Sequence, residues 1–303
     1  MIAYDGSASA EATLDDLQRA GLPTDAEAMV ISVAELWFSA PPLSGREMSI
    51  SALSADSPSP SQQPGRSDGE SEAVAIAEQG ADRVRRVFPK WEVTAEACIG
   101  SPATQILERA EQWNPDLIVV GSHGRSALGR LVLGSVSQKI VTGARCSVRI
   151  GRGKVEVEDP KARILIATDG FEDSDAAVKA VAARLWPQGS QARLLTAIGP
   201  FFTGVQVEEE KKMAEEIQHT AAVELQESGL EVSFLIKEAD PRRLIIDEAE
   251  KWGADSIFVG SSGIGGFERL LVGSVSAAVA ARSHCSVEVV RADRDKIQKQ
   301  GKK

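Results

Sequence analysis

Hydrophobic and polar positions along the second half of the chain predict strands separated by helices. The strands are short, nearly continuous apolar runs, typical of parallel strands that helices cover on both faces. We predict them at residues 163–169, 191–198, 230–236, 254–260 and 285–290. Apolar residues recur at helical spacing between these runs. We therefore predict helices at residues 174–186, 241–252 and 274–283, and a long helix with Met213, Ile217, Ala221 and Leu225 on one apolar face.

The first half repeats this order of elements. We predict strands at residues 30–36, 91–97, 115–121 and 146–150 and a helix at residues 102–113. Strands that alternate with helices imply right-handed crossovers and a doubly wound parallel sheet. The predicted fold class is α/β, with two such units in tandem.

A glycine-rich phrase that occurs twice shows that the chain carries an internal repeat. It reads GSHGRSALGRLVLGSVS at 121–137 and GSSGIGGFERLLVGSVS at 260–276, an offset of 139 residues. The Asp-Gly pairs of "AYDGS" (3–7) and "ATDGF" (167–171) are offset by 164. The first half is therefore longer, and we assign the excess to the serine- and proline-rich residues 39–70, a disordered or loosely held surface insert.

These boundaries divide the chain into four parts. We expect a first unit at residues 1–150, a linker at 151–162, a second unit at 163–291 and a flexible tail at 292–303.

The composition argues against several classes of protein. A chain of 303 residues with 43% apolar residues can bury the cores of about two domains. Its net charge of -10 argues against a nucleic-acid partner. We find no membrane-spanning run and no signal peptide, so we expect a cytoplasmic protein without a membrane partner. The three cysteines and three histidines show no ligand spacing, so we expect neither a disulfide framework nor a dedicated metal site.

The repeated phrase has chemistry suited to an anion. In a doubly wound sheet, ligands bind beyond the carboxyl ends of the strands, where Asp5 and Asp169 end the first strands of the two units. Glycines allow the backbone to approach a ligand closely. The Gly-Ser pair that ends each phrase opens a helix, and Ser135 and Ser274 suit its N-cap position. The positive end of such a helix attracts phosphate.

The common nucleotide and nucleophile motifs are absent from the sequence. There is no GxxxxGK[ST] phosphate loop, no complete GxGxxG fingerprint and no GxSxG nucleophile elbow. From the residues alone, a nucleotide or another phosphate ligand is favoured over glycines that serve loop geometry only.

Both halves resemble the universal stress protein family. The G-2x-G-9x-G-[ST] phrase after the fourth strand, with an Asp at the end of the first strand, resembles the ATP-binding branch of that family. The resemblance implies two five-stranded sheets ordered 3-2-1-4-5, a Rossmann-like fold of the adenine nucleotide alpha hydrolase type. It also implies that fifth strands pair across a dimer axis, here as an intramolecular pseudo-dimer, with a homodimer as a further option.

The resemblance implies a set of nucleotide-binding residues in each unit. In the first unit, Ala3, Tyr4 and Asp5 would contact adenine and ribose, and the backbone of Val33 would meet the adenine edge. The ribose and phosphates would be lined by Val120, Gly121, His123, Gly124, Arg125, Gly134, Ser135, Val136 and Ser137. The equivalent residues of the second unit are Ala167, Thr168, Asp169, Ala197, Val259, Gly260, Gly263, Gly273, Ser274, Val275 and Ser276.

The two sites are expected to be unequal. Ser262 and Ile264 stand where the first unit has His123 and Arg125, so the second pocket is expected to hold a triphosphate less tightly or to prefer AMP.

The leading hypothesis is a nucleotide-dependent stress-response protein that binds ATP, ADP or AMP, with Mg²⁺ accompanying the nucleotide and at most slow hydrolysis. We assign no catalytic residue. The alternatives are an interaction scaffold with non-functional pockets and a weak ATPase or adenylyl-transfer enzyme, although the HxGH and SGGxDS motifs of such enzymes are absent from the sequence.

Overall fold

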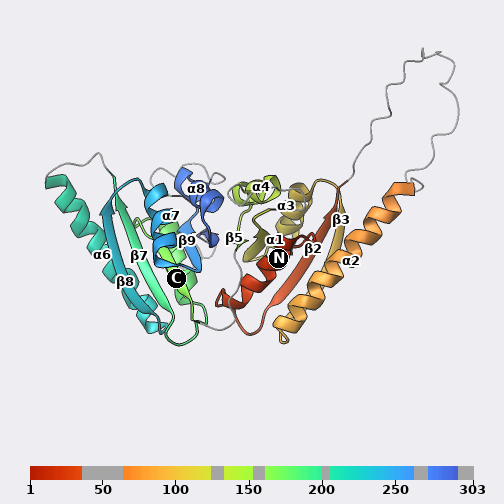
Figure 1. Cartoon of the computed structure of the whole chain (residues 1–303), viewed down its shortest axis with the longest axis horizontal. Helices are drawn as coiled ribbons and strands as arrows, with labels where there is room; N and C mark the ends of the chain where they lie inside the picture. The colour runs from red at the N-terminus through yellow and green to blue at the C-terminus, as the bar shows by residue number, and fades with distance from the viewer. Residues whose placement is uncertain (36–63, 124–132, 153–160, 200–204, 263–271, 293–303) are drawn as a thin grey trace, which may run out of the picture.

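A computed structural model describes residues 1–35, 64–123, 133–152, 161–199, 205–262 and 272–292 (Figure 1). These residues form ten strands in one sheet, in the order β3-β2-β1-β4-β5-β10-β9-β6-β7-β8. The strands of the first unit are β1 Ile2–Ala3, β2 Glu27–Ala34, β3 Glu92–Ile99, β4 Leu117–Gly121 and β5 Ser147–Gly151. Those of the second are β6 Arg163–Ala167, β7 Gln191–Ile198, β8 Glu231–Glu238, β9 Ser256–Gly260 and β10 Ser286–Val290.

The expected fold class is confirmed. Each half of the sheet has its strands in the order 3-2-1-4-5, and neighbouring strands within a half pair in parallel. The halves meet where β5 and β10 pair antiparallel. The pairing of fifth strands within one chain, which the family resemblance implied, is therefore present in the structure.

Helices cover both faces of the sheet (Figure 1). The first unit contains α1 Ala8–Asp16, a 3₁₀ turn at Leu17–Arg19, α2 Pro64–Val87, α3 Pro102–Trp113 and α4 Ser135–Gly143. The second contains α5 Glu172–Ala182, α6 Val205–Glu227, α7 Pro241–Trp252 and α8 Ser274–Arg282. Separate apolar cores lie beneath α1 and α2 and beneath α5 and α6, whereas α3, α4, α7 and α8 share one core that continues across both units. None of the helices in the described ranges is long and apolar enough to cross a membrane.

The structure corrects the extent of the predicted insert at residues 39–70. Helix α2 already begins at Pro64, within that range. Proline is favoured in the first turn of a helix, where its missing N–H costs no hydrogen bond. The sheet anchors this helix through the small buried residues Ala73, Ala77 and Ala81. Residues 36–63, and residues 293–303 of the predicted tail, lie outside the described residues.

The buried face of α6 also differs from the prediction. Met213 is 58% exposed, and the inner face is formed by Ala214, Gln218 and Ala222. The side-chain amide of Gln218 donates to Thr196 Oγ1 at 2.9 Å and is only 1% exposed. Leu225 is buried as predicted, and Ile217 and Ala221 are half-buried. A polar side chain can occupy a core position when its hydrogen bonds are made there, and the apolar periodicity therefore missed Gln218 and wrongly included Met213.

Candidate functional site

The strand order reverses between β1 and β4 in the first unit and between β6 and β9 in the second. Ile2 of β1 lies beside Val119 of β4, and Ala167 of β6 lies beside Val259 of β9. The connections leaving β1 and β4 run to opposite sides of this point, which is where open α/β sheets form a ligand crevice. The residues after β1 and β4, and after β6 and β9, therefore define one candidate site in each unit.

An aspartate follows the first strand of each unit in the same tight turn. Asp5 Oδ1 accepts the backbone N–H of Ser7 at 3.0 Å, and Asp169 Oδ1 accepts that of Phe171 at 3.1 Å. The glycines between them, Gly6 and Gly170, have φ values of 72° and 78°. This left-handed backbone favours glycine, so the Asp-Gly pair fixes the position of each carboxylate at the rim of the crevice.

The glycine that ends the fourth strand has a structural role in both units. A Cβ on Gly121 would lie 2.9 Å from Ser9 Oγ, and one on Gly260 would lie 2.7 Å from the carbonyl carbon of Asp173. The first helix of each unit thus passes too close for any side chain at this position. These two glycines are explained by packing without a ligand.

The glycine that precedes the fourth helix has no such explanation in the second unit. Gly273 has a φ of -61°, which every residue adopts, and a Cβ there would meet its nearest neighbour, Ser261 O, at an ordinary 3.5 Å. The described residues leave room for a side chain at Gly273. A backbone that must be approached by a ligand would require glycine at this position.

The prediction that Ser135 and Ser274 are the N-caps of α4 and α8 is wrong. The N-caps are Gly134 and Gly273, and the serines are the first helical residues. Glycine is tolerated at this position but offers no side-chain oxygen to the first-turn N–H groups. Both serine side chains are exposed. Among the described residues, no side-chain hydrogen bond caps the start of either helix, so its first N–H groups can bond an acceptor from a ligand.

The second serine of each phrase ties its helix to the end of the fourth strand. Ser137 Oγ donates to the carbonyl of Gly121 at 2.6 Å, and Ser276 Oγ donates to that of Gly260 at 2.5 Å. Both serines are buried, at 6% and 3% exposure. Because both hydroxyls already donate to a backbone carbonyl, they do not donate to a ligand as well. Their main contribution is to hold the start of the helix against the crevice.

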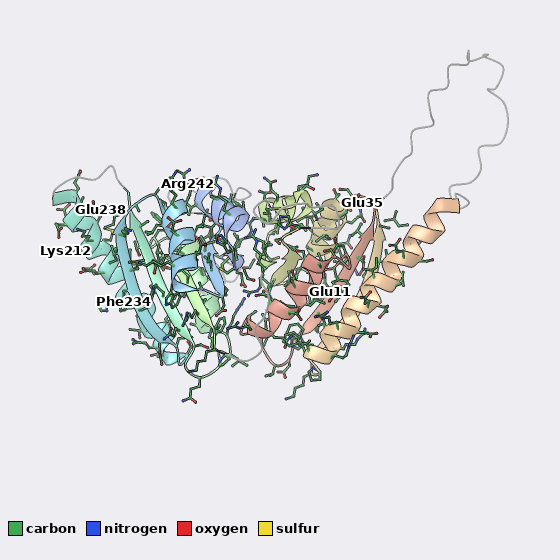
Figure 2. All side chains as sticks on the ribbon, viewed as in Figure 1. Glu11, Glu35, Lys212, Phe234, Glu238 and Arg242 are labelled. Atoms are coloured by element: carbon green, nitrogen blue, oxygen red, sulfur yellow. The ribbon has the colours of Figure 1, made fainter. Side chains whose placement is uncertain are left out.

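Some predicted nucleotide-binding side chains point away from the crevice into the core. Tyr4 is 2% exposed, packs against Gly80 and donates its hydroxyl to Glu11. Glu11 is labelled on α1 in Figure 2. Thr168 is 5% exposed, and its hydroxyl lies 2.9 Å from that of Thr196. These residues can present only their backbone to a ligand at the strand ends.

The remaining predicted residues divide into three groups. The small residues Ala3, Val33, Ala167 and Ala197 pack on the sheet face that carries the shared core, together with Val136 and Val275. Val120 and Val259 are buried in the same core. Gly124, Arg125 and Gly263 lie outside the described residues.

His123 lies two residues after the end of β4 and is the last described residue before the gap at 124–132. Its backbone N–H donates to Ser9 Oγ at 3.2 Å, and its Nδ1 lies 3.0 Å from Ser122 Oγ. Its Nε2 is buried and has no hydrogen-bond partner within the described residues. When Nδ1 accepts the Ser122 hydroxyl, Nε2 carries the ring proton and is a donor for an acceptor brought by a ligand.

A residue that the sequence analysis did not identify supports the second phrase. Asp173 occupies the position of Ser9 in the repeat and is 4% exposed. Its Oδ2 accepts Ser261 Oγ at 2.7 Å, Ser262 N at 2.9 Å and Ser262 Oγ at 2.5 Å, and its Oδ1 accepts Ala292 N at 3.1 Å. Burial opposes ionisation, but these hydrogen bonds outweigh it and lower the pKa of Asp173. Comparison of the two halves at the offset of 164 residues would have revealed the exchange of Ser for Asp.

No group of three or more His, Cys, Asp or Glu side chains within the described ranges is arranged to hold a metal ion. A divalent cation at either crevice would therefore take most of its oxygen ligands from a bound phosphate and water, as Mg²⁺ commonly does.

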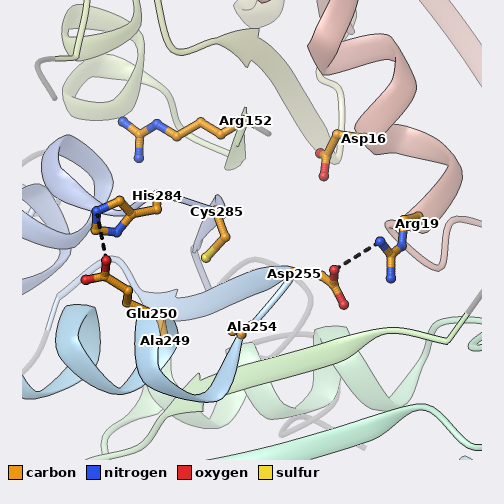
Figure 3. A pocket seen from close by; sticks show the side chains of 10 residues that line it. Asp16, Arg19, Arg152, Ala249, Glu250, Ala254, Asp255, His284 and Cys285 are labelled. Atoms are coloured by element: carbon orange, nitrogen blue, oxygen red, sulfur yellow. Dashed lines mark ion pairs between the residues drawn. The ribbon is translucent and has the colours of Figure 1, made fainter. Parts of the chain in front are cut away.

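A separate cavity of about 320 Å³ lies between the units, away from the crevices (Figure 3). In its wall Arg19 pairs with Asp255 at 3.1 Å, and His284 Nε2 lies 3.8 Å from Glu250 Oε1. Arg152 also lines it and donates to backbone carbonyls. Cys285 also lines it, and burial raises the pKa of this thiol to about 12. Because acidic and basic side chains both line this cavity, its chemistry does not favour one class of ligand.

Comparison with known proteins finds two successive units in the chain, as the sheet topology does. The family described as Universal stress protein family matches residues 1–152 and, a second time, residues 162–291. Universal stress protein Rv2005c of Mycobacterium tuberculosis is 31% identical over 235 residues, which cover 72% of this chain and 74% of that protein.

Solved structures share the fold. The crystal structure of a universal stress protein from Archaeoglobus fulgidus covers 96% of this chain and 98% of its own, with a TM-score of 0.65 and 23% identity. A universal stress protein solved in complex with cAMP covers 45% of this chain and 100% of its own, with a TM-score of 0.34 and 23% identity. Because the family matches nearly the whole chain in two successive copies, the chain belongs to the universal stress protein family and carries two of its domains in tandem.

Proposed function

We propose that this protein binds adenine nucleotides, ATP foremost, at the two crevices and that the bound nucleotide regulates its part in a cytoplasmic stress response. The observation that carries the proposal is Gly273. Its φ and surroundings permit a side chain, yet the residue is glycine at the start of a helix that has no side-chain cap. A phosphate bound against the backbone would account for both features, because helix N-termini present free N–H groups and a positive dipole end to anions.

Each proposed contact follows from the placement of the residues. Phosphates would lie at Gly134 and Ser135 in the first unit and at Gly273 and Ser274 in the second. The ring of His123 would donate from Nε2 to a phosphate oxygen. Asp5 and Asp169 would accept ribose hydroxyls, since carboxylates at the strand ends are suited to that bond. Adenine would rest on the small side chains of the first and second strands, with ADP or AMP as alternative ligands and Mg²⁺ on the phosphates.

The second crevice is proposed to favour fewer phosphates. Ser262 replaces His123, and its hydroxyl donates to Asp173, so it is a weaker candidate to donate to a phosphate. The ionised carboxylate of Asp173 also adds negative charge beneath the loop, which opposes a highly charged ligand.

Two measurements test the proposal. Purified protein is denatured by heat and the released small molecules are separated by chromatography; calorimetry then measures Mg-ATP binding. We expect one to two adenine nucleotides per chain. Absence of nucleotide, together with no thermal shift on adding Mg-ATP, AMP or ADP, would instead support the scaffold alternative. Release of ADP, together with turnover faster than a few per minute, would support the enzyme.

A matched pair of glycine variants locates the site. Gly273→Ala should weaken nucleotide binding in the second unit at least tenfold. It should lower the melting temperature only slightly, because the described residues leave room for the methyl group and alanine is a poorer N-cap than glycine by about 1 kcal/mol. Gly69→Ala is the control, since its Cβ would also meet only an ordinary contact, Ala34 Cβ at 3.7 Å. This control should leave the second unit's affinity unchanged. Unaltered binding in Gly273→Ala would contradict the proposed phosphate position.

A further inference from the structure

Arg149 and Glu288 face each other where the two units join. They are direct partners in the antiparallel ladder of β5 and β10, flanked by the pairs Val287–Ile150 and Val289–Val148. Residues 139 positions apart are equivalent in the repeat, so Arg149 is equivalent to Glu288. In the same way Val148 is equivalent to Val287 and Ile150 to Val289, so the repeat converts one flanking pair into the other. The pseudo-twofold axis that relates the units therefore passes between Arg149 and Glu288.

Both side chains are buried and carry opposite charges. Arg149 is 0% exposed and Glu288 is 1% exposed, and Arg149 Nη1 lies 3.4 Å from Glu288 Oε2. Each also has a partner of opposite charge in its own unit. Arg149 makes a two-point contact with Asp16 of α1, at 2.7 and 3.0 Å, and Glu288 binds Arg184, which follows α5. The junction thus encloses two positive and two negative side chains.

A twofold axis imposes a strict condition on this position. When two identical units pair through their fifth strands, the residue on the axis faces its own copy. Two first units paired in this way would bury Arg149 against Arg149, and two second units would bury Glu288 against Glu288. Asp16 would still pair with each Arg149, and Arg184 with each Glu288, but the contact across the axis itself would be repulsive. Like charges close together in a buried site are unfavourable, because little water remains to screen them. The native pairing of unlike units instead places opposite charges together.

We propose that Arg149 and Glu288 make the fifth-strand junction selective for unlike units, so that a first unit pairs with a second unit and neither pairs with its own kind. The edge of β5 accepts a fifth strand that places a carboxylate on the axis. In the native protein β10 of the same chain provides that strand, with Glu288 on the axis. Assembly of several chains must then use other surfaces, unless the chains exchange units. The selection does not depend on nucleotide binding.

Selectivity is tested with two complementary full-length variants, Arg149→Glu and Glu288→Arg. Each variant places like charges on the axis within its own chain. The second unit of Arg149→Glu still carries Glu288, and the first unit of Glu288→Arg still carries Arg149. When the variants are refolded together, these two unchanged units can form the native junction between chains. A tagged Arg149→Glu chain should therefore retain untagged Glu288→Arg and should not retain untagged Arg149→Glu.

Light scattering gives a second readout. The mixed variants should form a particle of about twice the wild-type mass, and each variant alone should melt at a lower temperature than the wild type. The proposal is overturned when the tagged chain retains both untagged variants equally, or neither, while the separate variants melt like the wild type.

A neutral variant covers the case in which charge reversal prevents folding. Arg149→Met together with Glu288→Met makes the two sides of the axis alike and uncharged. Refolding this chain at high concentration should raise the fraction of paired chains at least fivefold over the wild type, because self-pairing no longer opposes like charges. An unchanged fraction would show that these charges do not select the partner.

Discussion

Arg152, which directly follows β5 of the first unit, donates Nη2 to the carbonyl oxygen of Ala280 in the second unit, at 2.6 Å. The equivalent residue of the second unit, Arg291, donates to Val141 of the first unit at 2.8 Å. Val141 and Ala280 lie near the C-terminal ends of α4 and α8, the helices whose N-termini face the crevices. Cations near a helix C-terminus bind the last carbonyls and complement the dipole. Each unit therefore supports the candidate phosphate helix of the other.

This crossed arrangement predicts that the loss of an arginine affects the opposite unit. Burial lowers the pKa of Arg152 to about 10, so it remains charged at neutral pH. Arg152→Met should destabilise α8 by roughly 1–3 kcal/mol, the usual range for hydrogen bonds to a charged group. Hydrogen exchange followed by mass spectrometry should show faster exchange at the end of α8 and little change in α4.

Arg291→Met serves as the mirror control and should accelerate exchange in α4. If each variant disturbed only the unit to which it belongs, the arginines would not support the opposite helices.

Asp173 predicts a pH-dependent contribution to the stability of the second unit. Its folded-state pKa lies below the unfolded value of 3.8 because Ser262, Ser261 and Ala292 donate hydrogen bonds to the carboxylate. A depressed pKa contributes stability above pH 3.8 that is lost as the pH falls through the folded-state value. Asp173→Asn should therefore lower the free energy of unfolding at pH 7 by about 1–3 kcal/mol.

Urea unfolding at several pH values measures this effect. The difference between wild type and Asp173→Asn should shrink steadily below pH 3.8. Ser9→Ala, at the equivalent position of the first unit, supplies the control, and its effect should not vary over that range. A difference for Asp173→Asn that is constant from pH 7 to pH 3 would rule out the ionised carboxylate as the source.

The glycines of the repeated phrase should differ in their effect on stability. Gly260→Ala forces a methyl group to within 2.7 Å of the α5 backbone and should cost about 1–3 kcal/mol, as overpacking of a close contact does. Gly273→Ala should cost less, because its nearest contact is an ordinary one. Thermal unfolding without nucleotide measures both. Equal destabilisation by the two substitutions would show that Gly273 is also needed for folding.

Cys285 should be chemically inert in the folded protein. Burial raises the pKa of its thiol to about 12, which leaves roughly one thiolate in ten thousand at pH 8. We expect Ellman's reagent to modify Cys285 at least ~100-fold more slowly than free cysteine and at the normal rate after unfolding in urea. The variant Cys98→Ser/Cys146→Ser isolates this thiol. Rapid modification of the folded variant would show that Cys285 is accessible as a thiolate.

The sequence by itself determined the fold class and the place of the candidate site. Apolar runs of strand length and helices opened by proline are local signals, and α3, α7 and β7 have the predicted bounds. The repeat showed that the two units are equivalent, whereas the strand order 3-2-1-4-5 was implied by the resemblance to the universal stress protein family. The remaining conclusions depend on patterns within a few consecutive residues, or on the comparison of one half with the other.

Only the tertiary structure decided which atoms meet. It buried Gln218 in place of Met213, turned Tyr4 into the core, made Gly134 and Gly273 the N-caps, and brought Arg152 onto a helix of the other unit. Such contacts join residues far apart in the sequence, and they depend on the distances between packed elements. No local periodicity encodes those distances, because hydrogen bonding and close packing choose among several faces that are equally compatible with the sequence pattern.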